Sequence, residues 1–317
     1  MKGTTKELSI VLILTVLSSL SVRSSAFQAT PCMHNLGLVS NTNNYCATLQ
    51  RQTILSTTVS VCKSTQLMSK RSIRSSNLSL QSSLKTDDMI GKENEEENLD
   101  IIFNGQTTIS LIAAQSLLVV GAIVAANLLN IPNNGLGNGF ILDSASIQSG
   151  LIAIFPLFVL AVVLDFVEKK VPALQDVSKA TQRSVLALLG STRKPLIALG
   201  VSIALGAAAG ISEEMLFRGV LQSELGNKFG ETAALISSAV IFGALHAVTP
   251  LYALLAGLAS IYFGELYIQY HNLAIPIVCH GVYDVGALFA AHWVVSGMSN
   301  KERIELENWT PPGAIDR

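Results

Sequence analysis

The sequence is short of charged residues. Asp, Glu, Lys and Arg make up 14% of its 317 residues, and the formal net charge is −1. An ordinary soluble domain carries about 25% charged residues. There is also no basic stripe with interleaved aromatic residues, so we expect no nucleic-acid partner. This composition argues against an ordinary soluble protein and favours a protein of the lipid bilayer.

The charged residues are missing mainly from the C-terminal two-thirds of the chain. None lies between Asp100 and Asp143, and none lies between Lys194 and Glu213. Segments of this kind reach the roughly 20 apolar residues that cross a bilayer. We therefore predict an all-α fold, a polytopic transmembrane bundle of about six helices. The expected spans lie near residues 107–130, 147–167, 195–225, 231–248, 250–270 and 273–296.

Two segments with the composition of targeting signals precede the membrane domain. Residues 1–26 have the order of a secretory signal peptide: two Lys, an apolar stretch, then small residues. The alternative, a first transmembrane helix, would be short and interrupted by Ser. Residues 27–85 lack Asp and Glu and are rich in Ser and basic residues, as in a transit peptide.

Phe27 follows the expected cleavage point, so the two segments together resemble the bipartite presequence of plastids bounded by four membranes. We therefore expect an integral membrane protein of a complex plastid, in the thylakoid or the inner envelope. The alternative location is the endoplasmic reticulum membrane. Of the four cysteines, only Cys279 lies beyond the presequence, so no intramolecular disulfide is expected in the mature chain.

Composition also sets the remaining domain limits. Acidic residues concentrate just after the presequence and predict a disordered tail over residues 86–106. The membrane domain is expected over residues 107–297, followed by a C-terminal tail over residues 298–317. Basic residues collect between the second and third spans, which places that loop on the stromal side if the plastid location holds. Within it, residues 171–190 are expected to form an interfacial amphipathic helix.

The third predicted span contains a small-residue pattern and a charged cluster. Gly206 and Gly210 are four residues apart, which permits close helix approach in lipid; simple small-residue composition is the alternative. Glu214 and Arg218 are i,i+4 neighbours that can form a buried ion pair. Glu213 is turned about 100° away and has no cation in its own helix.

This asymmetry predicts two different roles for the neighbouring glutamates. Glu214, held by Arg218, is expected to stay ionised and serve the structure. Glu213, desolvated and facing elsewhere, is expected to be available for proton transfer. In the alternative interpretation both glutamates sit at a membrane–water interface and neither is special.

Two further polar clusters lie on the next helices. Phe242 and His246 share one helical face, and so do His280 and Asp284. A single His on an apolar helix is more often a satisfied core residue, but ionisable groups in lipid each need a partner. We therefore expect them to surround one polar cavity together with Glu213. His271 and His292 are interpreted as interfacial.

In this order, Glu-Glu-x-x-x-Arg, Phe-x-x-x-His and His-x-x-x-Asp closely resemble the motifs of the CAAX-protease and bacteriocin-processing (CPBP, or ABI) family of intramembrane endopeptidases. The resemblance covers roughly residues 195–297. It implies an all-helical intramembrane protease, related to type II prenyl-protein peptidases that remove the last three residues of prenylated proteins. Those peptidases have Asn at the final motif position, where this chain has Asp284.

The resemblance implies that six residues form the active site: Glu213, Glu214, Arg218, His246, His280 and Asp284. Peptide hydrolysis needs a base for water and donors for the oxyanion. Glu213 with His246 fits the first role, and His280 with Asp284 fits the second. Neither Ser212 nor Cys279 has a base at helical spacing, so both are interpreted as packing residues.

The role of a metal is left open by the sequence. The family is usually called a metalloprotease family, although a metal-free glutamate mechanism has also been proposed for it. Glu213, His246, His280 and Asp284 would suit a divalent ion such as Zn²⁺ with an open water position. The usual zinc-protease helix, His-Glu-x-x-His, is absent.

The sequence therefore predicts an endopeptidase that acts on a membrane protein or a lipidated peptide within the bilayer. Two other classes are alternatives. A non-catalytic membrane scaffold or assembly factor would keep the polar cluster for structure. A transporter would use buried Glu and His as a proton relay, but it should also show inverted repeats and broken helices, and neither is visible in the sequence.

Overall fold

The computed structural model describes residues 101–312. The predicted signal peptide, the transit segment and most of the acidic tail lie outside these described residues, so they stay predictions. Within residues 101–312 every regular element is a helix, which confirms the predicted fold class. Five helical segments are long and apolar enough to cross a membrane. They are Gly105–Leu129, Ser144–Glu168, Pro195–Phe229, Pro250–Tyr270 and Ala274–Gly297.

The helices follow one another through short connections. In chain order the elements are α3 (Gly105–Leu129), the short 3₁₀ turn η1 (Pro132–Gly135), α4 (Ser144–Ala153), α5 (Phe155–Glu168), α6 (Pro172–Leu189), α7 (Pro195–Glu214), η2 (Met215–Gln222), α8 (Ser223–Phe229), α9 (Glu231–Leu245), α10 (Pro250–Tyr270), α11 (Ala274–Gly297) and α12 (Asn300–Asn308). The third predicted span therefore combines three of these elements, α7, η2 and α8.

The predicted span 231–248 corresponds to α9, which is shorter than expected. The helix ends at Leu245 and has 15 residues, so it is about 22 Å long. A bilayer core is about 30 Å thick. α9 packs against α10 and η2, and it contributes an apolar helix that belongs to the bundle without reaching the length of the five candidate spans.

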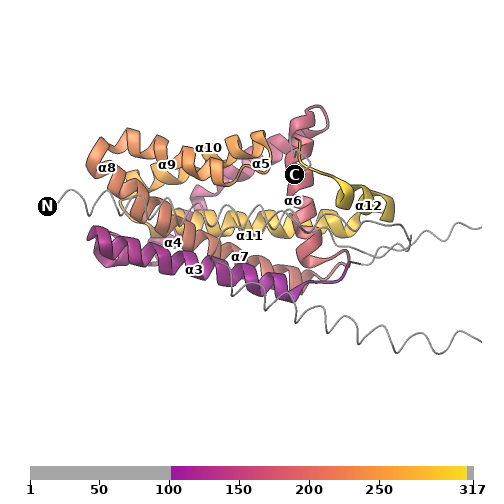
Figure 1. Cartoon of the computed structure of the whole chain (residues 1–317), viewed down its shortest axis with the longest axis horizontal. Helices are drawn as coiled ribbons and strands as arrows, with labels where there is room; N and C mark the ends of the chain where they lie inside the picture. Colours follow the sequence, from indigo (N-terminus) through magenta and orange to yellow (C-terminus); the bar gives the residue numbers. More distant parts are fainter. Residues whose placement is uncertain (1–100, 313–317) are drawn as a thin grey trace, which may run out of the picture. The chain divides into compact units, whose positions relative to one another are not determined.

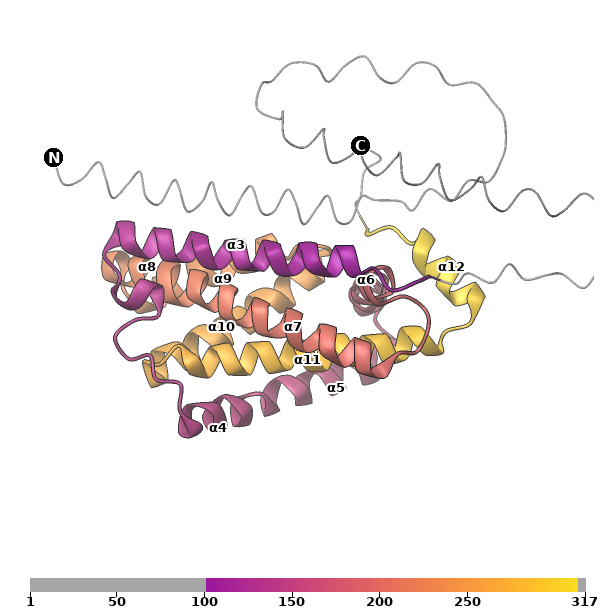
Figure 2. The ribbon, with the colours of Figure 1, turned by 90° about the horizontal axis from the view of Figure 1, so that it is seen from below.

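Figures 1 and 2 show how the long helices and α6 are arranged. α7 packs against both α3 and α11, and it lies between them in Figure 2. α6 crosses the long helices instead of running along them (Figure 1). Its apolar residues are buried, among them Leu174, Val185 and Leu189, so residues 171–190 form an amphipathic helix as predicted. Its place at the membrane surface stays a prediction.

The close approach of α7 and α11 depends on glycine. A Cβ atom at Gly206 would lie 2.6 Å from the carbonyl oxygen of Gly281, and one at Gly210 would lie 2.8 Å from the amide nitrogen of Gly281. Real Cβ atoms do not approach that closely. The small-residue packing predicted for Gly206 and Gly210 is therefore confirmed, and it brings the charged end of α7 next to His280.

The ends of the domain differ from the expected limits. Ser191 Oγ accepts a hydrogen bond from the Ile101 amide, and the Ser191 amide donates to the Ile101 carbonyl. The ordered domain thus includes residues that we had assigned to the acidic tail. At the other end, α12 occupies part of the predicted C-terminal tail. It begins with a capping box between Ser299 and Glu302, which holds the pKa of Glu302 below its ordinary value.

Candidate active site

The charged cluster of the third span lies where the backbone changes its helical form. α7 ends at Glu214, and the next eight residues, Met215–Gln222, form a π-helix in which every residue is buried. π-helical turns are rare and are often found at functional sites. The sequence predicts one regular α-helix over this segment, and the π-helix corrects that prediction.

The predicted ion pair is present and has more partners than expected. Arg218 Nη1 lies 2.8 Å from Glu214 Oε1, and both side chains are fully buried. Arg218 Nη2 donates to the carbonyl oxygen and to the hydroxyl of Ser260 on α10, at 2.8 Å each. His280 Nδ1 lies 2.7 Å from the same oxygen of Glu214. Glu214 therefore joins α7 to α11 and orients His280, in addition to holding Arg218.

The two ring nitrogens of His280 have different partners. Nδ1 contacts Glu214, and Nε2 faces two more carboxylates. Nε2 lies 3.5 Å from Asp284 Oδ2 and 4.0 Å from Glu213 Oε2. The ring stacks on Phe263, with 4.6 Å between the ring centroids. The stacking and the Glu214 contact together fix the imidazole plane, so the direction in which Nε2 points is determined by the fold.

His246 closes the site from the end of α9. It is the C-terminal cap of that helix, not a residue of a continuing helical face as we had expected. Its ring stacks on Phe242, and Nδ1 lies 2.8 Å from the Phe242 carbonyl oxygen, to which it can only donate. Nε2 is then free to accept in the neutral ring, and it lies 3.8 Å from Glu213 Oε2.

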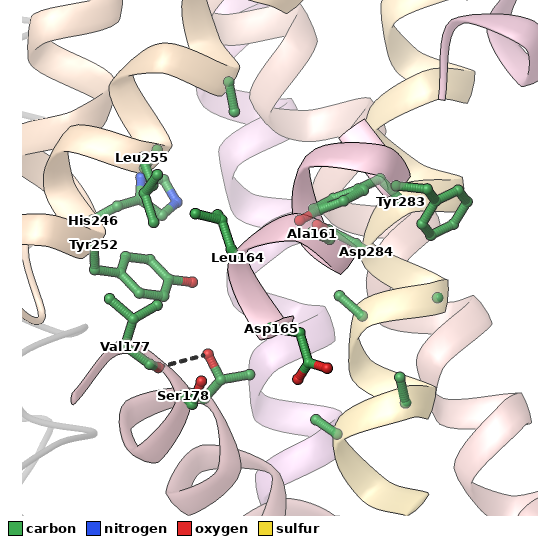
Figure 3. A pocket seen from close by; sticks show the side chains of 18 of the residues that line it. Ala161, Leu164, Asp165, Val177, Ser178, His246, Tyr252, Leu255, Tyr283 and Asp284 are labelled. Atoms are coloured by element: carbon green, nitrogen blue, oxygen red, sulfur yellow. Dashed lines mark hydrogen bonds between the residues drawn. The ribbon is translucent and has the colours of Figure 1, made fainter. Parts of the chain in front are cut away.

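Glu213 and Glu214 differ in their surroundings as the sequence predicted. The Glu213 side chain retains 13% exposure and lines a cavity of about 700 Å³, together with His246, His280 and Asp284. Glu214 and Arg218 are not among the residues that line it. Figure 3 shows His246 and Tyr252 on one side of this cavity and Tyr283 and Asp284 on the other. The four predicted residues thus line one common cavity, as expected.

Two hydrogen-bonding residues of the site, Gln115 and Ser212, were not predicted from the sequence. Gln115 on α3 donates from Nε2 to Glu213 Oε1 at 3.1 Å, and its carbonyl oxygen accepts from Ser212 Oγ. Ser212 is therefore a hydrogen-bonding residue, whereas we had assigned it to packing. Gln115 is one of several polar residues in this span, with Ser116 and Asn127 among the others, so its type alone did not mark it as a site residue. His292 is buried at 1% exposure, and its predicted place at the membrane interface stays a prediction. Cys279 is fully buried in a hydrophobic cluster, as expected of a packing residue.

The predicted metal ligands lie close to one another around the cavity. Their donor atoms approach one another in pairs at 3.5–4.0 Å. Over residues 101–312, no group of three or more His, Cys, Asp or Glu side chains is placed so that it could hold a metal ion. Metal binding by Glu213, His246, His280 and Asp284 therefore stays a prediction, and the chemistry that the geometry offers is that of the side chains themselves.

A carboxylate, two imidazoles and a second carboxylate around a cavity between membrane-spanning helices are suited to activating water. Residues 195–286 match the family model described as Type II CAAX prenyl endopeptidase Rce1-like. This segment contains all six predicted site residues, and the resemblance to the CAAX-protease family is confirmed. The match supports CAAX-type intramembrane endopeptidase activity in general. The chain has no significant match among curated proteins or among solved structures.

Proposed function

We propose that this integral membrane protein hydrolyses a peptide bond of a membrane protein or a lipidated peptide, with Glu213 as the general base. The observation that carries the proposal is the geometry of Glu213 Oε2, which lies 3.8 Å from His246 Nε2 and 4.0 Å from His280 Nε2 on the cavity wall. These separations are too long for direct hydrogen bonds. They leave room for one water molecule to contact Glu213 and His246 together.

The proposed reaction begins with this water. Glu213 Oε2 takes one proton of the water, His246 Nε2 accepts a hydrogen bond from the O–H that remains, and the water oxygen attacks the scissile carbonyl carbon. Three carboxylates lie within 4.0 Å of His280, at Glu213, Glu214 and Asp284, which favours a protonated imidazole. His280 Nε2–H then donates to the oxyanion. Glu213 returns its proton to the leaving nitrogen, and the peptide bond breaks.

The cavity also bears on the kind of substrate. Its walls are mostly apolar and come from α5, α6, α10 and α11, in addition to the site residues. Apolar lining with a few convergent polar groups is typical of ligand sites. The cavity is therefore suited to an apolar chain, either a lipid attached to a peptide or hydrophobic side chains next to the cleaved bond. The scaffold alternative requires no such opening beside Glu213.

The proposal is tested by incubating the purified protein with a peptide library in lipid vesicles, with Glu213→Ala as the blank. New peptide ends should appear only with the wild-type protein, and their sequences would define the substrate. Prenylated and unprenylated versions of each cleaved peptide would separate the two substrate types. A wild-type protein with no more cleavage than the blank, across membrane peptides of both types, would favour the scaffold.

Replacing Asp284 by Asn separates the two chemical versions of the mechanism. If Asp284 acts beside His280 as a hydrogen-bonding group, the amide should retain activity within about tenfold of wild type. If it is an anionic metal ligand, activity and bound metal should fall together. Metal analysis of the purified wild-type and Asp284→Asn proteins, together with cleavage rates in the presence of a chelator, decides between these outcomes.

The plastid location is also proposed, on the composition of residues 1–85. A fusion of this segment to a fluorescent protein should enter a complex plastid, and Phe27→Ala should trap it outside. Microscopy with a plastid marker checks both results. Retention of the unmodified fusion in the secretory pathway would contradict the plastid location and favour the endoplasmic reticulum membrane.

A further inference from the structure

The site contains a side chain from outside the matched family segment. Gln115 belongs to α3, about eighty residues before that segment begins. Its amide nitrogen is 3.1 Å from Glu213 Oε1. Gln115 is not among the described residues that line the cavity, so it contacts the proposed base and not the space for the substrate.

Glu213 and Ser212 contact opposite ends of the Gln115 amide. The Ser212 hydroxyl is fully buried and donates to the Gln115 carbonyl oxygen. A glutamine amide has one acceptor end and one donor end. Because the ionised carboxylate of Glu213 can only accept hydrogen bonds, the NH₂ group of Gln115 must face Glu213, and the carbonyl end faces Ser212. Ser212 and Glu213 are neighbours on α7, so a single amide spans both.

The contact with Gln115 gives the two Glu213 oxygens different partners. Oε1 is held by Gln115, and Oε2 faces His246 and His280, where the proposed reaction places its water. A glutamate has broad freedom about its terminal torsion, and one hydrogen bond to Oε1 fixes the plane of the carboxylate. The carboxylate is then already in the orientation that proton transfer requires.

We propose that Gln115 is a positioning residue for Glu213, and that Ser212 positions Gln115 in turn. This inference rests on the proposed function, since it assigns a helper to the base of that reaction. It extends the active site to α3, which the three sequence motifs do not include. The α3–α7 contact then orders the carboxylate as well as packing the bundle.

The test replaces Gln115 by Met, which has a similar shape but cannot form these hydrogen bonds. Cleavage by Gln115→Met should show a kcat about 10- to 100-fold lower, with KM unchanged, because only the orientation of the base is lost. Ser212→Ala should lower kcat by a smaller factor in the wild-type protein and cause no further loss in the Gln115→Met protein. Ser116→Ala is the matched control and should leave kcat unchanged, since among residues 101–312 the Ser116 hydroxyl bonds within its own helix, to the Ile112 carbonyl.

Several results would overturn this inference without touching the proposed function. With the wild-type protein active, an unchanged kcat in Gln115→Met would do so, as would a rise in KM alone or additive losses with Ser212→Ala. Melting in detergent identifies a variant that is poorly folded. If the Gln115→Met protein does not accumulate, the Ser212→Ala protein is measured instead, and an unchanged kcat in that protein overturns the inference. Inactivity of the wild-type protein itself would instead contradict the proposed function.

Discussion

Glu213→Gln protein is expected to accumulate to the wild-type level and to cleave at least about 10²–10⁴-fold more slowly, the contribution of general-base catalysis. The amide cannot take a proton from water. Folding should be nearly unaffected, because Glu213 forms no ion pair with Lys or Arg among the described residues and its partner Gln115 can still donate to the amide oxygen. Removing a charge at a site with 13% exposure relieves part of its desolvation cost.

The matched control is Glu224→Gln. Glu224 lies on α8, in the same continuous helical segment, and is buried beside Lys228 outside the cavity. The Glu224→Gln protein should keep full activity. That result would show that neutralising a buried glutamate of this segment does not itself inactivate the protein. Initial cleavage rates and melting temperatures in detergent provide the measurement. Cleavage by Glu213→Gln at the wild-type rate would rule out Glu213 as the base.

The parts of the site that lie within one helix could be predicted from the sequence. The Glu214–Arg218 pair depends only on the spacing of four residues, which remains compatible with contact at the start of the π-helix. The same spacing explains why Glu214 is buried against Arg218, whereas Glu213 has no such partner and stays partly exposed. The membrane spans follow from hydropathy and length, because the bilayer fixes both.

The contacts between helices could not be predicted in this way. The bond from His280 to Glu214 requires the register and distance between α7 and α11, which the glycines at 206, 210 and 281 determine by steric contact. Gln115 is about a hundred residues from Glu213 in the chain, and nothing in its local sequence indicates which helix it faces. The cap geometry of His246 depends on where α9 ends, and helix ends are the least reliable part of a pattern-based assignment.

The largest effects on stability are expected at Glu214 and Arg218. Each single change, Glu214→Gln or Arg218→Met, breaks a fully buried ion pair by removing one partner, at a cost of about 3–5 kcal/mol. Glu214→Gln leaves Arg218 without its carboxylate, and Arg218→Met leaves Glu214 with His280 alone. The double change leaves neither charge and should recover part of the loss. Lys228→Met is the matched control, because Lys228 pairs with Glu224 at the same spacing but retains 27% exposure; it should cost less than about 1 kcal/mol. Unfolding in a denaturing detergent series measures all four variants.

Activity per folded molecule then separates the two partners of this pair. Glu214 Oε1 also contacts His280 Nδ1, so Glu214→Gln should lower cleavage even in the molecules that fold, because the imidazole loses the charge that favours its protonated form. Arg218→Met leaves the His280–Glu214 contact in place and should retain most of its activity once folded. Arg218 lies outside the cavity and bonds only to Glu214 and Ser260 through its terminal nitrogens among the described residues. Strictly additive stability losses would contradict a working ion pair, and equal activity losses per folded molecule would contradict the separate role of Glu214 at His280.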